Sequence, residues 1–114
     1  MTPRPDSRTG LLPIAVTIMT DIYNVPQAKF AMGQLFATAA VVRELKREDI
    51  GIALSRHARG DWGDVCPEDR DANESALLDG LRLFSVYHDR KGVKFWIITE
   101  TDRNSTTVLL PDDY

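Results

Sequence analysis

The chain has 114 residues, of which 43% are apolar and 27% are charged, and its formal net charge is −3. A chain of this length and composition can bury one core without disulfides or bound metal. The acidic balance argues against binding to nucleic acid, since domains that hold phosphate backbones usually present a basic excess. The single cysteine, Cys66, excludes an internal disulfide and a metal site with four cysteine ligands.

Residues 1–10 contain two prolines, one glycine and mixed charge without periodicity, and they predict a flexible N-terminal tail. One domain is expected over residues 11–114. The apolar run from Leu11 to Met19 is short and is interrupted by Pro13 and Thr17, so it predicts neither a signal peptide nor a membrane span. We therefore expect a cytoplasmic protein that makes no membrane contact.

Two strands are predicted early in the domain, over residues 11–20 and 30–38. Gly33, in the middle of the second strand, indicates a bulge or the close approach of another backbone. Thr38 is expected to cap a short helix that continues to Leu45.

A second helix is predicted to begin at Asp49, whose side chain is expected to cap it. Gly60 suits the left-handed position just past its end. Its apolar face has the i, i+3, i+4 and i+7 spacing of a buried helix side, and the residues at those positions are Ile50, Ala53, Leu54 and His57.

A third helix is predicted from Pro67 to about Asp79, with Gly80 ending it. Its apolar content is thin, so most of its surface should face water. It displays carboxylates at Glu68, Asp69, Asp71, Glu74 and Asp79. Such a helix can imitate a DNA phosphate track and so occupy a DNA-binding protein, but a solvated face is the usual outcome.

The last third predicts a hairpin, because two β-branched and aromatic runs, 81–88 and 93–99, flank the turn sequence Asp89-Arg90-Lys91-Gly92. This turn pairs Val86 with Trp96 and Phe84 with Ile98 on one face, and places Leu83, Phe95 and Ile97 on the other. A final strand is predicted over residues 106–110. The expected fold is α+β: an antiparallel sheet of four or five strands with a C-terminal β-meander, and two to three short helices packed on one side.

Residues 56–64 (Arg-His-Ala-Arg-Gly-Asp-Trp-Gly-Asp) and residues 96–111 resemble a family of small uncharacterised bacterial proteins. Members are often labelled plasmid-related proteins and occur on plasmids, phages and integrated elements. The similarity spans roughly Phe30 to Tyr114. It implies a mobile-element setting and a compact fold, and it supplies no catalytic residues to carry over.

The loop over residues 60–64 is a candidate recognition loop, because aromatic residues flanked by glycines often contact partners. Its candidate binding residues are Trp62, Asp61 and Asp64. The alternative is a tryptophan folded back onto the core. His57, just before the loop, is either a general base oriented by one of these aspartates or a half-buried histidine bonded to backbone.

A second candidate site combines His57 with the polar stretch after the hairpin. An RNA-cleaving site would use Glu100 as base, His57 as acid and Arg103 to hold phosphate. The alternative is that the stretch forms a side-chain-supported turn. The hairpin register pairs Arg82 with Glu100 and so excludes an acid–base partnership between Glu100 and His88.

These observations lead to two hypotheses about function. The first is a non-catalytic accessory protein of a mobile genetic element that binds another protein, with counter-defence as one such role, and with contacts from the loop aspartates, Trp62 and Arg103. The alternative is a small metal-independent ribonuclease that uses His57, Glu100 and Arg103. Neither hypothesis requires a cofactor or a metal ion.

Overall fold

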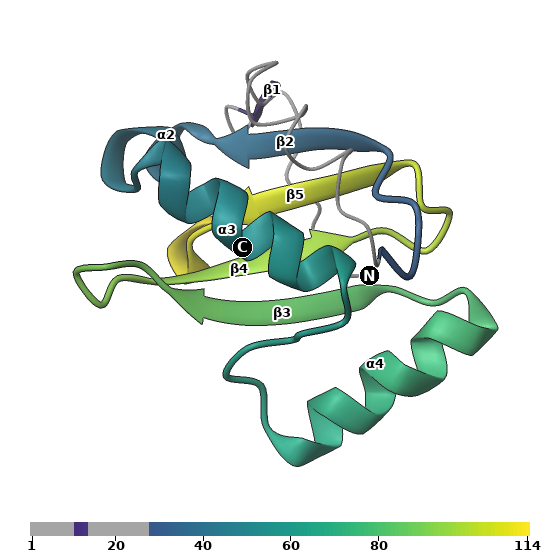
Figure 1. The fold of residues 1–114 in the computed structure, drawn as a ribbon. Coiled ribbons are helices and arrows are strands. Elements are labelled where there is room, and N and C mark those ends of the chain that lie inside the picture. The colour runs from purple at the N-terminus through teal and green to yellow at the C-terminus, as the bar shows by residue number, and fades with distance from the viewer. Residues whose placement is uncertain (1–10, 14–27) are drawn as a thin grey trace.

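The computed structural model describes residues 11–13 and 28–114. The predicted tail and residues 14–20 of the first predicted strand lie outside the described residues. Within them the fold is α+β, as predicted, with a five-stranded sheet and three helices (Figure 1). The elements in chain order are β1 (Leu11–Pro13), β2 (Gln34–Thr38), α2 (Ala39–Glu44), α3 (Arg47–Ala58), α4 (Pro67–Asp79), β3 (Leu83–His88), β4 (Lys94–Thr99), β5 (Ser105–Leu109) and the 3-10 turn η2 (Pro111–Asp113).

The sheet has the strand order β1-β2-β5-β4-β3 and is mixed, so the prediction of a purely antiparallel sheet was wrong at one pair. β2 runs parallel to β5, with Leu35 opposite Thr106. A tight turn forces neighbouring strands to be antiparallel, but β2 and β5 are separated by all three helices and the hairpin. No turn therefore sets their relative direction.

The predicted hairpin is confirmed in its turn and in its register. The amide of Asp89 donates to the carbonyl oxygen of Val93 at 3.0 Å, and Gly92 adopts a φ of 87°. Val86 lies opposite Trp96, as the turn length requires. β5 follows on the other side of β4 and completes the predicted meander.

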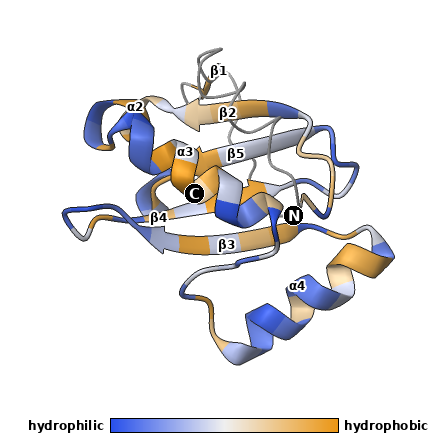
Figure 2. Ribbon diagram, in the orientation of Figure 1, coloured by the Kyte–Doolittle hydropathy of each residue, from blue (hydrophilic) through white to orange (hydrophobic). Residues whose placement is uncertain are grey.

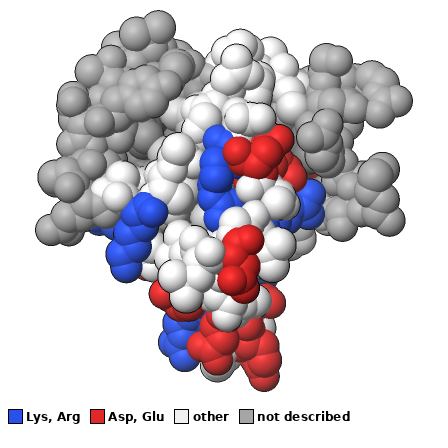
Figure 3. All heavy atoms as spheres, turned by 90° about the vertical axis from the view of Figure 1, so that its right-hand side faces the viewer, with Lys and Arg blue, Asp and Glu red and all other residues white. Residues whose placement is uncertain are grey.

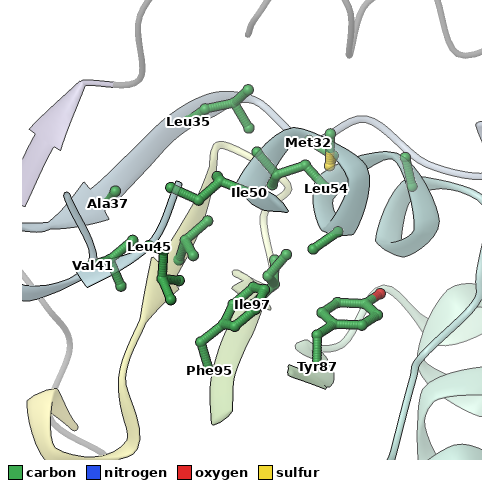
Figure 4. Packing of buried hydrophobic residues seen from close by; sticks show 13 residues of the cluster. Met32, Leu35, Ala37, Val41, Leu45, Ile50, Leu54, Tyr87, Phe95 and Ile97 are labelled. Carbon is green, nitrogen blue, oxygen red and sulfur yellow. The ribbon is translucent and has the colours of Figure 1, made fainter. Parts of the chain in front are cut away.

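The main core lies between α3 and one face of the sheet. Leu54 of α3 and Ile97 of β4 are completely buried, and Phe95 is 1% exposed. Figure 4 shows the side chains of α3 facing those of β2 and β4 across this layer. A smaller cluster of Trp62, Ala76 and Leu83 joins α4 to the edge of the sheet at β3.

Two side-chain caps at helix N-termini were predicted, and one of them is correct. The hydroxyl of Thr38 accepts from the amide of Val41 at 3.2 Å and caps α2. α3, in contrast, begins at Arg47 without a side-chain cap, so Asp49 lies inside its first turn. The carboxylate of Asp49 instead accepts from Arg90 on the hairpin turn, at 2.9 Å and 3.0 Å, which removes it from the capping role.

β2 begins at Gln34, four residues later than predicted, because the backbone approaches another segment at Gly33. This glycine has a φ of 66°, and a Cβ atom there would lie 2.3 Å from the backbone of Asn104. The predicted close approach is therefore confirmed, and it interrupts the extended conformation before the strand begins.

Candidate functional site

His57 lies in the last turn of α3 and is completely buried. Its ring is packed edge-on against Phe30, at a centroid distance of 5.3 Å, and against Trp62, at 5.7 Å. This environment follows from the helical spacing, because His57 continues the apolar side formed by Ala53 and Leu54.

Both ring nitrogens of His57 take part in a directional chain of hydrogen bonds. Thr106 donates its only hydroxyl proton to the carbonyl oxygen of Met32 at 2.7 Å, so it must accept from Thr99, 2.7 Å away. Thr99 consequently accepts from Nε2–H of His57 at 2.9 Å. The neutral ring then accepts at Nδ1 from the hydroxyl of Ser85, at 2.6 Å.

The surroundings of His57 favour its neutral form. Burial lowers the pKa of His57 to about 3, and the positive charge of Arg103 acts in the same direction. A general acid must carry a proton and bring it within hydrogen-bonding distance of a substrate. A completely buried neutral ring with two committed nitrogens meets neither requirement in this conformation.

Arg103 lies close to His57 but is committed to backbone. Its guanidinium donates to the carbonyl oxygens of Leu81, Ala76 and Glu100, at 2.7, 3.0 and 3.1 Å. These bonds tie the end of α4 to the loop before β5. The N–H groups that would hold phosphate in the ribonuclease hypothesis thus donate to carbonyl oxygens within the protein.

Glu100 has the partner that the hairpin register predicted. Its carboxylate accepts from Arg82 at 3.3 Å. His88 lies at the opposite end of β3 and bonds Asp64, with Nδ1 and Oδ2 separated by 2.8 Å. His57, Glu100 and Arg103 are therefore brought into one region of the described fold, but each serves a structural partner there.

The loop over residues 60–64 presents its aspartates and buries its tryptophan. Trp62 is 3% exposed, and its Nε1–H donates to Glu74 of α4 at 2.7 Å. Asp61 is exposed and accepts from Arg56 at 2.7 Å, which lowers the pKa of this carboxyl. Asp64 is exposed as well. Of the expected binding residues in this loop, the two aspartates are accessible and Trp62 belongs to the core.

α4 packs beside the outer strand of the sheet with only Asn73 and Ala76 fully buried (Figure 1). The side-chain amide of Asn73 donates to the carbonyl oxygen of Phe84 at 2.6 Å, and its oxygen accepts from the amide of Phe84 at 3.0 Å. Two residues further along β3, the backbone of Val86 bonds the backbone of Trp62 and Asp64 at the same edge. These contacts occupy the edge of β3, so a partner strand cannot add there without displacing them.

The opposite side of α4 is exposed and carries a leucine that sequence reasoning did not single out. Leu78 is 89% exposed, and Leu81, just after the helix, is 53% exposed. At 100° per residue, burial of Asn73 and Ala76 turns Leu78 outward, on the same side as Asp71 and Ser75. Figure 2 shows the C-terminal end of this otherwise hydrophilic helix as hydrophobic.

The acidity of the chain is concentrated in α4. The sequence has 17 acidic and 14 basic residues, and residues 67–79 hold five of the acidic ones but a single basic one, Arg70. The remaining 101 residues carry 12 acidic and 13 basic side chains, a net charge of +1. Figure 3 shows carboxylates gathered at the lower end of the molecule, where α4 lies.

Comparison with protein-family models, with curated proteins and with solved structures gave no match. In the described residues, no helix is long and apolar enough to cross a membrane. Nor do residues 11–13 and 28–114 contain a group of three or more His, Cys, Asp or Glu side chains placed to hold a metal ion.

Proposed function

We propose that this chain is a non-catalytic protein that binds another protein through the outward side of α4. We call this surface the α4 face and define it by the exposed helix residues Asp71, Ser75, Leu78 and Asp79 and by the exposed Leu81, two residues after the helix. The exposure of Leu78, at 89%, is the observation that carries the proposal. Burying a leucine side chain contributes about 1.5–3 kcal/mol, and exposed apolar side chains that lie together with a polar rim mark interaction surfaces.

The helix is held rigidly enough to present a defined surface. Trp62 bonds Glu74, Asn73 bonds Phe84, and Arg103 bonds the carbonyl oxygen of Ala76. Two of the expected binding residues, Trp62 and Arg103, thus support α4 from the inside. Asp61 and Asp64 are exposed on the loop that leads into the helix, where Asp61 bonds Arg56 and Asp64 bonds His88.

The mobile-element setting rests on the sequence resemblance over residues 56–64 and 96–111. Under that setting the partner is a protein of the host or of a competing element, and counter-defence is one role that fits. The ribonuclease alternative receives no support from His57, since its ring is completely buried and both of its nitrogens have partners.

Photo-crosslinking from single positions tests the proposed function. A photoreactive amino acid replaces Leu78 in one version of the full chain and Ile52, a 62% exposed residue of α3, in the control version. In cells of the native host, we expect a discrete protein adduct from position 78 that position 52 does not give. An equal pattern from both positions, or no adduct from position 78, would overturn the proposal.

A further inference from the structure

We infer that the α4 face binds a protein surface on which lysine or arginine side chains surround an apolar patch. The inference rests on the proposed function and adds the chemical class of the partner. It combines the exposed leucines of the face with the charge that surrounds them.

The carboxylates of α4 are only partly explained by the stability of the helix itself. Glu68 and Asp69 lie in the first turn, where negative charge complements the helix dipole. Asp71 stands three residues from both Glu68 and Glu74, a spacing at which like charges repel. Asp79 lies at the negative end of the dipole, and the last turn has no basic residue. These positions disfavour the isolated helix, and a basic partner would reverse that effect.

The apolar part of the face narrows the class of partner further. Leu78 lies on the exposed side of the helix two turns after Asp71, and the exposed Leu81 follows the helix. A surface that only imitated a phosphate track would gain nothing from an 89% exposed leucine at its centre. Charge and apolar exposure together fit a partner with an apolar patch inside a basic rim, the usual anatomy of a protein interface.

Among residues 11–13 and 28–114, the position of α4 leaves this face exposed for such a partner. On its opposite side, the helix packs on the rest of the described fold through Asn73, Ala76 and the partly buried Leu77, and Glu74 accepts from Trp62. The adjoining edge of β3 is occupied by Asn73 and the loop before α4. A partner is therefore expected to dock side chain against side chain on the helix and not to extend the sheet.

Three synthetic amphipathic peptides of equal length test the inference by fluorescence anisotropy with the full chain. The first combines lysine with leucine, the second lysine with serine, and the third glutamate with leucine. We expect binding of the first peptide only, weakened by added salt because its charged contacts are exposed. Equal binding of the lysine–serine peptide would show that charge alone is recognised and would overturn the inference, as would binding of the glutamate–leucine peptide or no binding at all.

Variants locate the binding on the face. Leu78→Ser should weaken binding of the lysine–leucine peptide by about tenfold or more, whereas Ile52→Ser, which replaces a similarly exposed apolar residue on α3, should leave it unchanged. The combined Asp71→Asn and Asp79→Asn variant should bind more weakly and with less dependence on salt. Leu78→Ser without effect, or an equal effect of Ile52→Ser, contradicts the inference. Thermal unfolding of each variant checks that it folds.

The two proposals fail separately. An adduct from position 78 in the crosslinking experiment, together with no binding of the lysine–leucine peptide, would leave the proposed function standing and remove the basic partner. Absence of that adduct would remove the binding function itself.

Discussion

Asn73 of α4 bonds the backbone of Phe84 in both directions, donating to its carbonyl oxygen at 2.6 Å and accepting from its amide at 3.0 Å. One side chain thereby supplies the two bonds that a neighbouring strand would make at that residue of β3. The same contact helps to hold α4 against the sheet, so Asn73 contributes both to the closure of this edge and to the orientation of the α4 face.

We expect Asn73→Ala to lower the free energy of unfolding by about 1–3 kcal/mol, because it leaves a partly buried amide and carbonyl without partners. Ser75→Ala is the matched control on the exposed side of the same helix and should change stability by less than about 0.5 kcal/mol. Urea denaturation of the two variants measures the difference. Similar values for both would show that the bonds to Phe84 contribute little.

The free energy of unfolding should decrease as the pH is lowered through the range in which His57 titrates in the unfolded chain. Burial lowers the pKa of His57 from 6.5 to about 3, so the unfolded state binds more protons than the folded state between these values. Stability from this residue is fully present above pH 6.5 and decreases as the pH falls, by up to about 1.4 kcal/mol per pH unit. Carboxylates with lowered pKa, such as Asp61, contribute mainly below pH 4–5 (roughly one unit around their ordinary value) and leave the range from 6.5 to 5 to histidine.

His57→Gln tests this assignment, because glutamine keeps one donor and one acceptor for Thr99 and Ser85 but does not titrate. The measured free energy of unfolding should be nearly constant from pH 6.5 to 5 in this variant. His88→Gln removes the other histidine of the sequence and should keep the slope. A slope that survives in His57→Gln would mean that another group is responsible.

The features that the sequence predicted correctly are those that local chemistry decides. The hairpin follows from Asp89 and Gly92 at the ends of its turn, and the register then follows from the turn length. α4 begins at Pro67 and ends before Gly80 because these residues suit those two positions. The partnership of Arg82 with Glu100 needed nothing beyond that register.

The features that were wrong or missed depend on distant parts of the chain. Aspartate is a common residue at helix N-caps, but the carboxylate of Asp49 accepts from Arg90, 41 residues away. The parallel pairing of β2 with β5 is likewise set by long connections that leave no signal in either strand.

Part of the candidate site could be predicted from the sequence. The inward positions of the hairpin alternate, so the register that buried Leu83 and Ile97 also buried Ser85 and Thr99, the two residues that bond His57. The exposure of Leu78 required knowing which side of α4 packs on the sheet. That side is chosen by Asn73, a polar residue that a search for apolar periodicity passes over.

Two glycines separate the effect of backbone strain from the effect of close packing. Gly63 and Gly80 both have positive φ values, 74° and 70°. A Cβ atom on Gly63 would lie 2.0 Å from the carbonyl oxygen of Val86, whereas nothing lies within 4 Å of one on Gly80. Gly80→Ala should therefore cost about 1–2 kcal/mol from conformation alone, and Gly63→Ala a further 1–3 kcal/mol or so because the bridge to β3 must shift. Equal losses in guanidinium denaturation would argue against a tight contact at Gly63.

Substitution of Arg103 tests whether this residue supports α4 or contacts a partner directly. Its planar guanidinium reaches the carbonyl oxygens of Ala76, Leu81 and Glu100 together, and the single ammonium of a lysine cannot reproduce that arrangement. Arg103→Lys should thus lower the free energy of unfolding by about 1–3 kcal/mol and speed amide hydrogen exchange at the end of α4.

A matched exposed arginine completes this test. The exposed guanidinium of Arg59 donates to the hydroxyl of Ser55 on α3, and Arg59→Lys should leave stability within about 0.5 kcal/mol of the parent protein. If Arg103→Lys were equally mild while peptide binding fell, Arg103 would belong to the contact surface. If Arg103→Lys instead lowers stability and speeds amide hydrogen exchange in α4, any loss of peptide binding is indirect. The guanidinium bonds carbonyl oxygens at the end of α4, so its loss would disturb the helix that carries Leu78.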